Sequence, residues 1–147
     1  MVPLKCRGLP AREVVTSFLR HEGKILLVKR SSRVGSFQGY WSGISGYLEG
    51  PVPLLQALRE IREETGLSGE SVRLISTGKP LEIPDPDHGV CWVVHPFLLE
   101  VDNPEDICLD WENTEFRWVE PGKINDFKTV PALAGALKAC MTGLNEN

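Results

Sequence analysis

The chain of 147 residues has no apolar run that approaches the ~18 residues needed to cross a membrane as a helix. Its first stretch, MVPLKCRGLPAREVV, also lacks the apolar segment of a secretory signal. We therefore expect a cytoplasmic protein that does not engage a membrane.

Cysteine is scarce and scattered. The four cysteines form no C-x-x-C pair and have no nearby histidine pattern, so the sequence argues against a zinc site. A disulfide framework is not expected in a cytosolic chain of this size either. We expect buried, unreactive thiols, with Cys6 near the N-terminus as the exception. The cysteines are Cys6, Cys91, Cys108 and Cys140.

Basic residues are not in excess. The 16 Lys and Arg are outnumbered by 20 Asp and Glu, which gives a net charge of −4. This balance argues against a protein that binds duplex nucleic acid through a broad basic face. It is compatible with a small anionic ligand held together with a metal ion. Because no repeat or linker-like segment interrupts the chain, we expect one domain over residues 1–147.

Hydrophobic periodicity predicts a chain that contains both strands and helices. Two strand-like runs, EVVTSFLR and KILLVKR, are joined across HEGK and predict a hairpin. The segment PLEIPDPDHG has three prolines and is expected to be a loop. Strands flanked by a helix on each side indicate an α/β fold with a mixed sheet. Further strands are expected around 42–48, 72–79, 89–101 and 115–120, a short turn or helix over 121–127, and helices over 53–65 and 130–144.

The predicted helix over 53–65 carries much acid on one side. Glu60, Glu63 and Glu64 stand at i, i+3 and i+4, where like charges repel one another. Either solvent and neighbouring arginines neutralise these carboxylates, or a cation does. Gly66 suits the left-handed residue that follows a helix end.

The segment REIREETGL, residues 59–67, resembles the second half of the Nudix hydrolase signature, G-x5-E-x7-R-E-U-x-E-E-x-G-U, in which U is aliphatic. Every fixed position of that half is matched. The order of elements over residues 13–140 is also similar to that of a Nudix domain. The resemblance implies a Nudix-like α/β/α sandwich with a mixed sheet.

The resemblance also implies roles for particular residues. Glu60, Glu63 and Glu64 would bind Mg²⁺ or Mn²⁺, because hard cations prefer carboxylate oxygens, and one of them would serve as general base. The main-chain carbonyl of Gly46 would complete the coordination. Arg59 stands four residues before Glu63 and would hold its carboxylate in place.

Other candidate site residues lie outside the signature. Some family members take a further acidic ligand from a downstream loop, for which Glu112 and Glu115 in DWENTEFRW are the candidates and Glu115 is preferred. Arg30 and Arg33 precede the glycine-rich loop and could contact substrate phosphates. They could equally be solvated side chains at a strand end.

The first half of the signature is altered. The position eight residues before Arg59 is Pro51, where the signature has glutamate. Gly46 lies one residue closer to Arg59 than the signature prescribes. By the resemblance, this glutamate would orient the arginine while the helix carboxylates hold the metal, so activity can survive its loss. Glu49 is nearby, but it does not stand at the position of the missing glutamate.

The resemblance predicts a metal-dependent hydrolase that cleaves the diphosphate of a nucleoside diphosphate linked to another moiety, with a homodimer as the default assembly. The altered first half leaves open a second hypothesis, a Nudix domain that binds a nucleotide without cleaving it. A third is isopentenyl diphosphate isomerisation, which in the family uses a cysteine and a glutamate. Cys91, in a strand-like run, matches that chemistry poorly.

Overall fold

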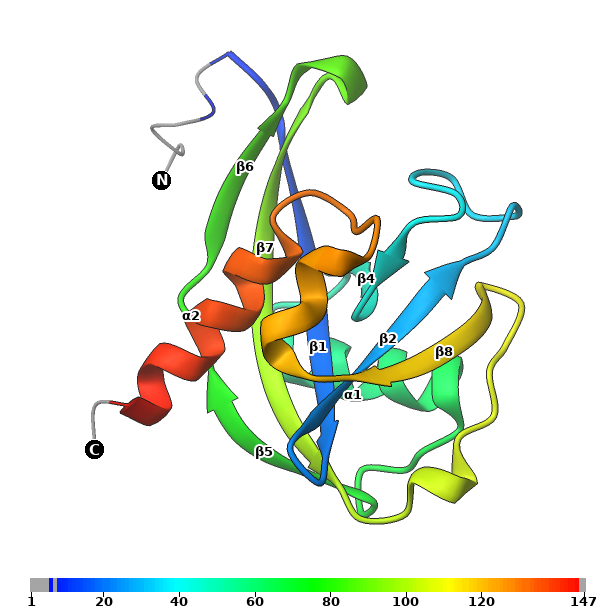
Figure 1. Cartoon of the computed structure of the whole chain (residues 1–147). Helices are drawn as coiled ribbons and strands as arrows, with labels where there is room; N and C mark the ends of the chain where they lie inside the picture. The colour runs from blue at the N-terminus through cyan, green and yellow to red at the C-terminus, as the bar shows by residue number, and fades with distance from the viewer. Residues whose placement is uncertain (1–5, 7, 146–147) are drawn as a thin grey trace.

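The computed structural model describes residue 6 and residues 8–145 (Figure 1). Four strands precede the first α-helix, and the second α-helix ends the described part of the chain. The regular elements are β1 (Ala11–His21), β2 (Lys24–Arg30), β3 (Trp41–Ser42), β4 (Ile44–Tyr47), α1 (Pro53–Thr65), β5 (Val72–Thr77), β6 (Leu81–Asp85), the 3₁₀ helix η2 (Pro86–His88), β7 (Val90–Val101), η3 (Pro104–Asp106), β8 (Asn113–Val119), η4 (Pro121–Asp126) and α2 (Leu133–Asn145).

The strands form one mixed sheet with β1 and β7 at its centre. These two long strands run parallel, from the pair Ala11 and Cys91 to the pair Arg20 and Glu100. The predicted hairpin of β1 and β2 is confirmed, and β4 pairs antiparallel with the middle of β1, from Val14 to Ser17. On the other side of β7, β6 and β5 pair antiparallel with successive parts of the strand. The predicted mixed sheet is therefore confirmed.

One helix packs on each face of the sheet (Figure 1). Side chains alternate between the two faces along β1. Val15 and Leu19 pack with Ile61 of α1, whereas Phe18 packs with Leu137 of α2. Two apolar clusters result, one between the sheet and each helix. This is the α/β/α arrangement that the resemblance implied.

The segment 80–89 was expected to be a loop, and this prediction is wrong for its first half. Leu81–Asp85 forms β6, which pairs antiparallel with the start of β7 and places Pro84 opposite Cys91. Proline lacks an N–H group, but β6 is bonded only to β7, so the missing donor faces the open edge of the sheet. The three prolines led to the prediction of a loop, although an edge strand tolerates proline.

The helix α1 begins and ends at the predicted residues, Pro53 and Thr65. Pro53 occupies the first turn, where a backbone N–H would have no partner. Gly66 takes a left-handed conformation at φ 78°, and its N–H donates a hydrogen bond to the Arg62 carbonyl at 2.9 Å. Leu67 then packs into the core with 2% of its surface exposed. The helix is thus fixed at both ends by local sequence.

Cys6 and Cys91 form a disulfide, which corrects the expectation of unpaired thiols. Cys91 lies near the start of β7 and is paired with Ala11 of β1, so the backbone already brings the N-terminal segment to it. Composition and spacing could not show this, because the two cysteines are separated by 85 positions in the chain. Cys108 and Cys140 are free, the first exposed and the second buried.

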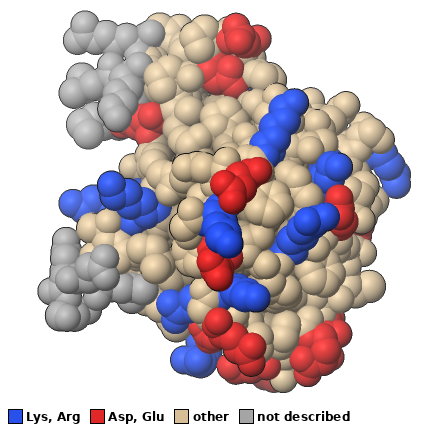
Figure 2. Space-filling view, in the orientation of Figure 1, with Lys and Arg blue, Asp and Glu red and all other residues tan. Residues whose placement is uncertain are grey.

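The surface carries charges of both signs. On the face drawn in Figure 2, basic and acidic side chains are interspersed. No helix within residues 8–145 is long and apolar enough to cross a membrane.

Candidate active site

A stripe of buried polar side chains runs along α1. Gln56, Glu60 and Glu64 follow one another at four-residue intervals, and their exposed fractions are only 5%, 9% and 3%. Glutamate is rarely buried unless it is paired with a cation or binds a metal. The solvated acidic face considered above is therefore excluded for Glu60 and Glu64. Glu63 differs, because half of its side chain is exposed.

A third carboxylate joins this stripe from the segment before β8. Oxygen atoms of Glu60, Glu64 and Glu112 lie within 4.8 Å of one another. Burial raises the pKa of Glu64 well above its usual range, and the charges of Glu112 and Glu60 raise it further. Burial also raises the pKa of Glu60, and it raises that of Glu112 to about 7. Three carboxylates are thus held together at a cost in free energy.

The donors of this cluster fit a divalent cation. The Asn113 side-chain amide donates a hydrogen bond to Glu64 Oε1 at 2.9 Å, whereas Glu64 Oε2 is buried without a partner. A buried carboxylate oxygen without a donor is costly. Convergent carboxylate oxygens are the ligands that Mg²⁺, Mn²⁺ and Ca²⁺ prefer. The cluster therefore has the chemistry of a site for a hard divalent metal ion.

Gly46 of β4 lies directly against this cluster. A Cβ built on Gly46 would overlap the carboxyl group of Glu60. The position has ordinary backbone dihedral angles, so close approach, and not conformational freedom, is what requires glycine here. The backbone of β4 can therefore lie beside the carboxylates only because residue 46 has no side chain.

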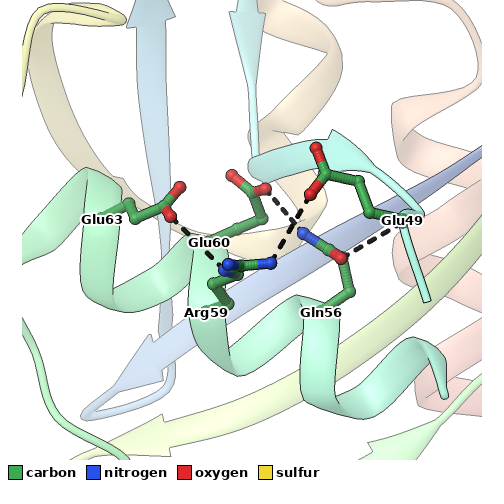
Figure 3. A network of polar contacts seen from close by, with 5 residues as sticks. All are labelled: Glu49, Gln56, Arg59, Glu60 and Glu63. Carbon is green, nitrogen blue, oxygen red and sulfur yellow. Dashed lines mark hydrogen bonds and ion pairs between the residues drawn. The ribbon is translucent and has the colours of Figure 1, made fainter.

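Arg59 connects the exposed side of α1 to the preceding loop (Figure 3). Its guanidinium lies 3.5 Å from Glu49 Oε2 and 3.6 Å from Glu63 Oε1. The Glu49 backbone N–H donates to Gln56 Oε1, and Gln56 Nε2 donates to Glu60 Oε1 at 3.0 Å. Glu49 thus contacts the arginine although it does not stand at the glutamate position of the signature. The chain of contacts ends on a carboxylate of the cluster.

A pocket of about 390 Å³ opens beside the cluster. Glu60, Glu63, Glu112 and Gly46 line one part of it, and the remainder extends over the sheet toward the start of α2. This volume lies within the range typical of sites for small organic ligands. The carboxylates can therefore act on a molecule held in the pocket.

A family model for the NUDIX domain matches residues 10–140. The chain belongs to the Nudix family. The match covers most of the chain and confirms both the predicted family and the predicted class of enzyme, a Nudix pyrophosphohydrolase. A comparison with curated protein sequences gives no match.

Solved structures of Nudix proteins share the fold. The MutT protein of Methanosarcina mazei Go1 has a TM-score of 0.76 at 22% identity, over 93% of this chain and 97% of that one. The Ap4A hydrolase of C. elegans in a binary complex has a TM-score of 0.72 at 18% identity, over 95% and 100% of the two chains. A Nudix hydrolase of Nitrosomonas europaea has a TM-score of 0.72 at 20% identity, over 91% and 90%. Identities this low establish the fold alone.

Of the two downstream acids in this Nudix chain, the structure brings Glu112 to the cluster and not the preferred Glu115. Glu115 lies opposite Lys29 of β2, and their charged groups are 3.8 Å apart. The register of β2 and β8 shifts between Lys29 and Arg30, where Arg30 is paired with Asn113. Sequence reasoning missed Asn113 altogether, although it directly follows Glu112 and holds Glu64.

The two candidate phosphate contacts separate in the structure. Arg30 lines the pocket, and its Nε donates a hydrogen bond to the Ser36 carbonyl at 3.0 Å. Burial lowers the pKa of Arg30, while the charges of Glu64 and Glu112 act in the opposite direction. Arg33 is exposed, does not line the pocket and lies 5.3 Å from the ring centre of Trp111. Of these two arginines, only Arg30 lines the pocket and could contact a ligand there.

Replacing Gly46 by alanine should displace the Glu60 carboxylate without unfolding the protein, because the new methyl group meets the movable end of a side chain. We expect half-maximal activation to need about 10–100-fold more Mg²⁺, in line with losses of ligand orientation at other metal sites. The measurement is a Mg²⁺ titration of activity. Gly122→Ala is the control, since its Cβ would meet no atom within 4 Å. Equal Mg²⁺ requirements in the two variants would show that the close approach of Gly46 to Glu60 does not affect metal binding.

Proposed function

We propose that the protein hydrolyses the diphosphate of a nucleoside diphosphate linked to another moiety, with Mg²⁺ or Mn²⁺ as cofactor. The main support is the buried Glu64 oxygen without a hydrogen-bond donor, which stands among two further carboxylates at the edge of a pocket. A polar atom left unpaired in this way is stabilised when a cation binds to it.

Glu60, Glu64 and Glu112 would hold the metal ion, with the Gly46 carbonyl beside them. Glu63 is exposed at the pocket and would complete the set once substrate is present. The bound ion would neutralise phosphate charge and polarise the attacking water. Glu115, 45% exposed and beside Lys29, is not part of this proposal.

The chain's other residues would position the substrate. Arg30 would donate hydrogen bonds to a phosphate, for which its fixed guanidinium is well suited. Arg59 would keep Glu63 and Glu49 in place from the outer side of α1. Water would attack one phosphorus, a carboxylate would accept the proton, and the bridging P–O bond would break. The electron pair of that bond would stay on the departing phosphate oxygen.

The test is a panel of nucleotide sugars, dinucleotides and nucleoside triphosphates, assayed for phosphorylated products with Mg²⁺ and with Mn²⁺. We expect turnover that EDTA abolishes. Glu112→Gln should lower kcat by about 10²-fold, because it removes a carboxylate of the cluster. Glu115→Gln, a matched control three residues along the chain, should retain full activity. Equal losses in the two variants would contradict the assignment of Glu112.

The hypothesis of a binding module predicts a different outcome, namely nucleotide binding without turnover under any divalent ion. The contact of Arg59 with Glu49 argues against a pure binding module, because Glu49 meets the arginine in place of the missing signature glutamate. The isomerase hypothesis is disfavoured by Cys91, which is fully buried and bonded to Cys6. A thiol in a disulfide cannot serve in acid–base chemistry.

A further inference from the structure

Gln56 is a buried polar residue that the Nudix signature does not specify. It falls in the stretch before Arg59 in which the signature accepts any residue. Only 5% of its surface is exposed, although glutamine is mostly found at protein surfaces. A buried amide loses its hydrogen bonds to water and needs partners in the protein. Its place in the first half of α1, one turn before Glu60, therefore calls for a physical reason.

The Gln56 amide has a partner for each of its two polar groups (Figure 3). Its Oε1 accepts a hydrogen bond from the Glu49 backbone N–H at 3.2 Å, and its Nε2 donates one to Glu60 Oε1 at 3.0 Å. An amide suits this place because it carries an acceptor and a donor on one rigid group. A carboxylate would repel Glu60, and an apolar side chain would leave the Glu49 N–H without this acceptor. The amide thus links the loop after β4 to the carboxylate cluster.

The backbone of this loop is held by two successive N–H groups. The Leu48 N–H donates to the Glu13 carbonyl of β1 at 2.9 Å, and the Glu49 N–H donates to Gln56. The first bond ties the loop to the sheet and the second ties it to α1. The side-chain contact of Glu49 with Arg59 adds little to this, because the two side chains are 69% and 62% exposed and such ion pairs are weak.

The Glu60 carboxylate is confined from two sides. The Gln56 amide holds Oε1 from within α1, and the backbone of Gly46 approaches so closely that a Cβ there would overlap the carboxyl group. Contacts that orient a ligating carboxylate typically contribute about 10–100-fold to metal affinity. A carboxylate has two oxygens and several lone pairs, so the bond from Gln56 leaves Glu60 able to bind a cation.

We propose that Gln56 is a positioning residue, which fixes the Glu60 carboxylate for a divalent cation and fastens the shortened loop to α1. The proposal rests on the proposed function, because it takes Glu60 as a metal ligand. It assigns this task to a neutral side chain because the nearby arginine is directed elsewhere. Arg59 contacts Glu49 and Glu63 on the exposed side of the helix, whereas Gln56 contacts the buried cluster.

Mn²⁺ binding to the nucleotide-free protein tests the proposal without any measurement of turnover. Gln56→Met keeps the length of the side chain but removes both polar groups, and it should raise the Mn²⁺ dissociation constant about tenfold. Free Mn²⁺ is measured by electron paramagnetic resonance during the titration. Gln38→Met, the same change at an exposed glutamine outside the pocket lining, is the control and should bind Mn²⁺ as the wild type does. Equal dissociation constants for the wild type and Gln56→Met would overturn the proposal.

A double variant separates the positioning of Glu60 from a general effect on the fold. In a Glu60→Gln background, Gln56→Met should change the Mn²⁺ dissociation constant by less than about threefold, because the carboxylate that it positions is absent. The same loss in both backgrounds would overturn the proposal, since the amide would then act independently of Glu60. Gln56→Asn has an amide too short to reach both partners and should match Gln56→Met. It provides the test if the methionine variant does not fold.

Hydrogen exchange at the Glu49 backbone N–H tests the link to the loop in the absence of metal. In EDTA, Gln56→Met should accelerate this exchange by about fivefold or more, as expected for loss of a neutral hydrogen bond. Glu60→Gln keeps the Gln56 acceptor and should leave the exchange rate unchanged. Unchanged exchange in Gln56→Met would refute the link.

The outcomes distinguish this proposal from the proposed hydrolysis. A wild type that binds Mn²⁺ but turns over no nucleotide would refute the hydrolysis, while a weaker Mn²⁺ affinity of Gln56→Met would still support the role of the amide. Metal-dependent turnover with equal Mn²⁺ affinities of the wild type and Gln56→Met would support the hydrolysis and refute the role of Gln56.

Discussion

Replacing Glu64 by glutamine is expected to lower kcat by about 10³-fold while the protein remains folded. Glu64 is 3% exposed, and its Oε2 is buried without a hydrogen-bond partner. Glutamine has nearly the same shape and keeps an oxygen for the Asn113 amide, but it brings no charge to hold a metal ion. The measurement is the steady-state rate at saturating Mg²⁺ on the best substrate of the panel.

The same variant should be more stable than the wild type when both are free of metal. The pKa values of Glu64 and Glu112 are raised by folding, so between about pH 4.5 and 7 the folded state binds more protons than the unfolded state. Stability of the metal-free wild type therefore falls as the pH rises through this range. Glu64→Gln removes one source of that fall. Thermal unfolding in EDTA at pH 5 and pH 8 measures the difference, which should be greater at pH 8.

Glu70→Gln, a change at an exposed position beyond α1, is the control for both readouts and should behave as the wild type. A Glu64→Gln protein that retains more than a tenth of the wild-type rate would contradict a role for Glu64 in binding the metal. A Glu64→Gln protein less stable than the wild type at pH 8 in EDTA would contradict the prediction that the buried Glu64 carboxylate destabilises the metal-free fold.

Loss of the disulfide between Cys6 and Cys91 should lower the free energy of unfolding by about 2–4 kcal/mol. The bond closes a loop of large sequence separation, 85 positions, and so restricts the unfolded chain strongly. For a domain of this size, Tm should fall by roughly 5–15 °C. The variant is Cys6→Ala, which leaves the buried Cys91 in place, and the measurement is thermal unfolding under oxidising conditions.

Two comparisons make this result specific to the disulfide. Cys108→Ser alters the exposed free cysteine and should leave Tm unchanged. A reducing agent should lower Tm of the wild type to that of Cys6→Ala and should not affect the variant. A wild type and a Cys6→Ala protein with the same Tm under oxidising conditions would show that the bond contributes nothing to stability.

The parts of the molecule that local sequence determines could be predicted. The helix α1 was predicted with its observed ends because Pro53 and Gly66 act within one turn of those ends. The burial of Glu60 and Glu64 together was not predicted. It depends on β4 and on the segment before β8, both of which approach α1 from other parts of the chain. Helical spacing gives the face of a side chain but not what packs against that face.

The features that the sequence did not predict depend on pairing between strands that are distant in the chain. Glu112 and Glu115 look alike in the sequence, and only the pairing with β2 distinguishes them: Glu115 lies opposite Lys29, whereas Glu112 directly precedes the strand and lies beside Glu64. β6 was hidden by Pro84, whose acceptability depends on the edge position of the strand. The disulfide depends on a parallel pairing of β1 with β7 that no local pattern specifies.

The contact of Glu49 with Arg59 has a consequence for recognising related chains. An acid contacts the arginine here although its separation in the sequence differs from that in the signature. A folded loop needs only to bring the two side chains together. A pattern with strict spacing across this loop would overlook the chain. One that allowed G-x2-E-x9-R before the helix acids, as residues 46–59 read, would recover it. Shortened loops of this kind can therefore be screened for an acid that restores the contact before a Nudix sequence is set aside as inactive.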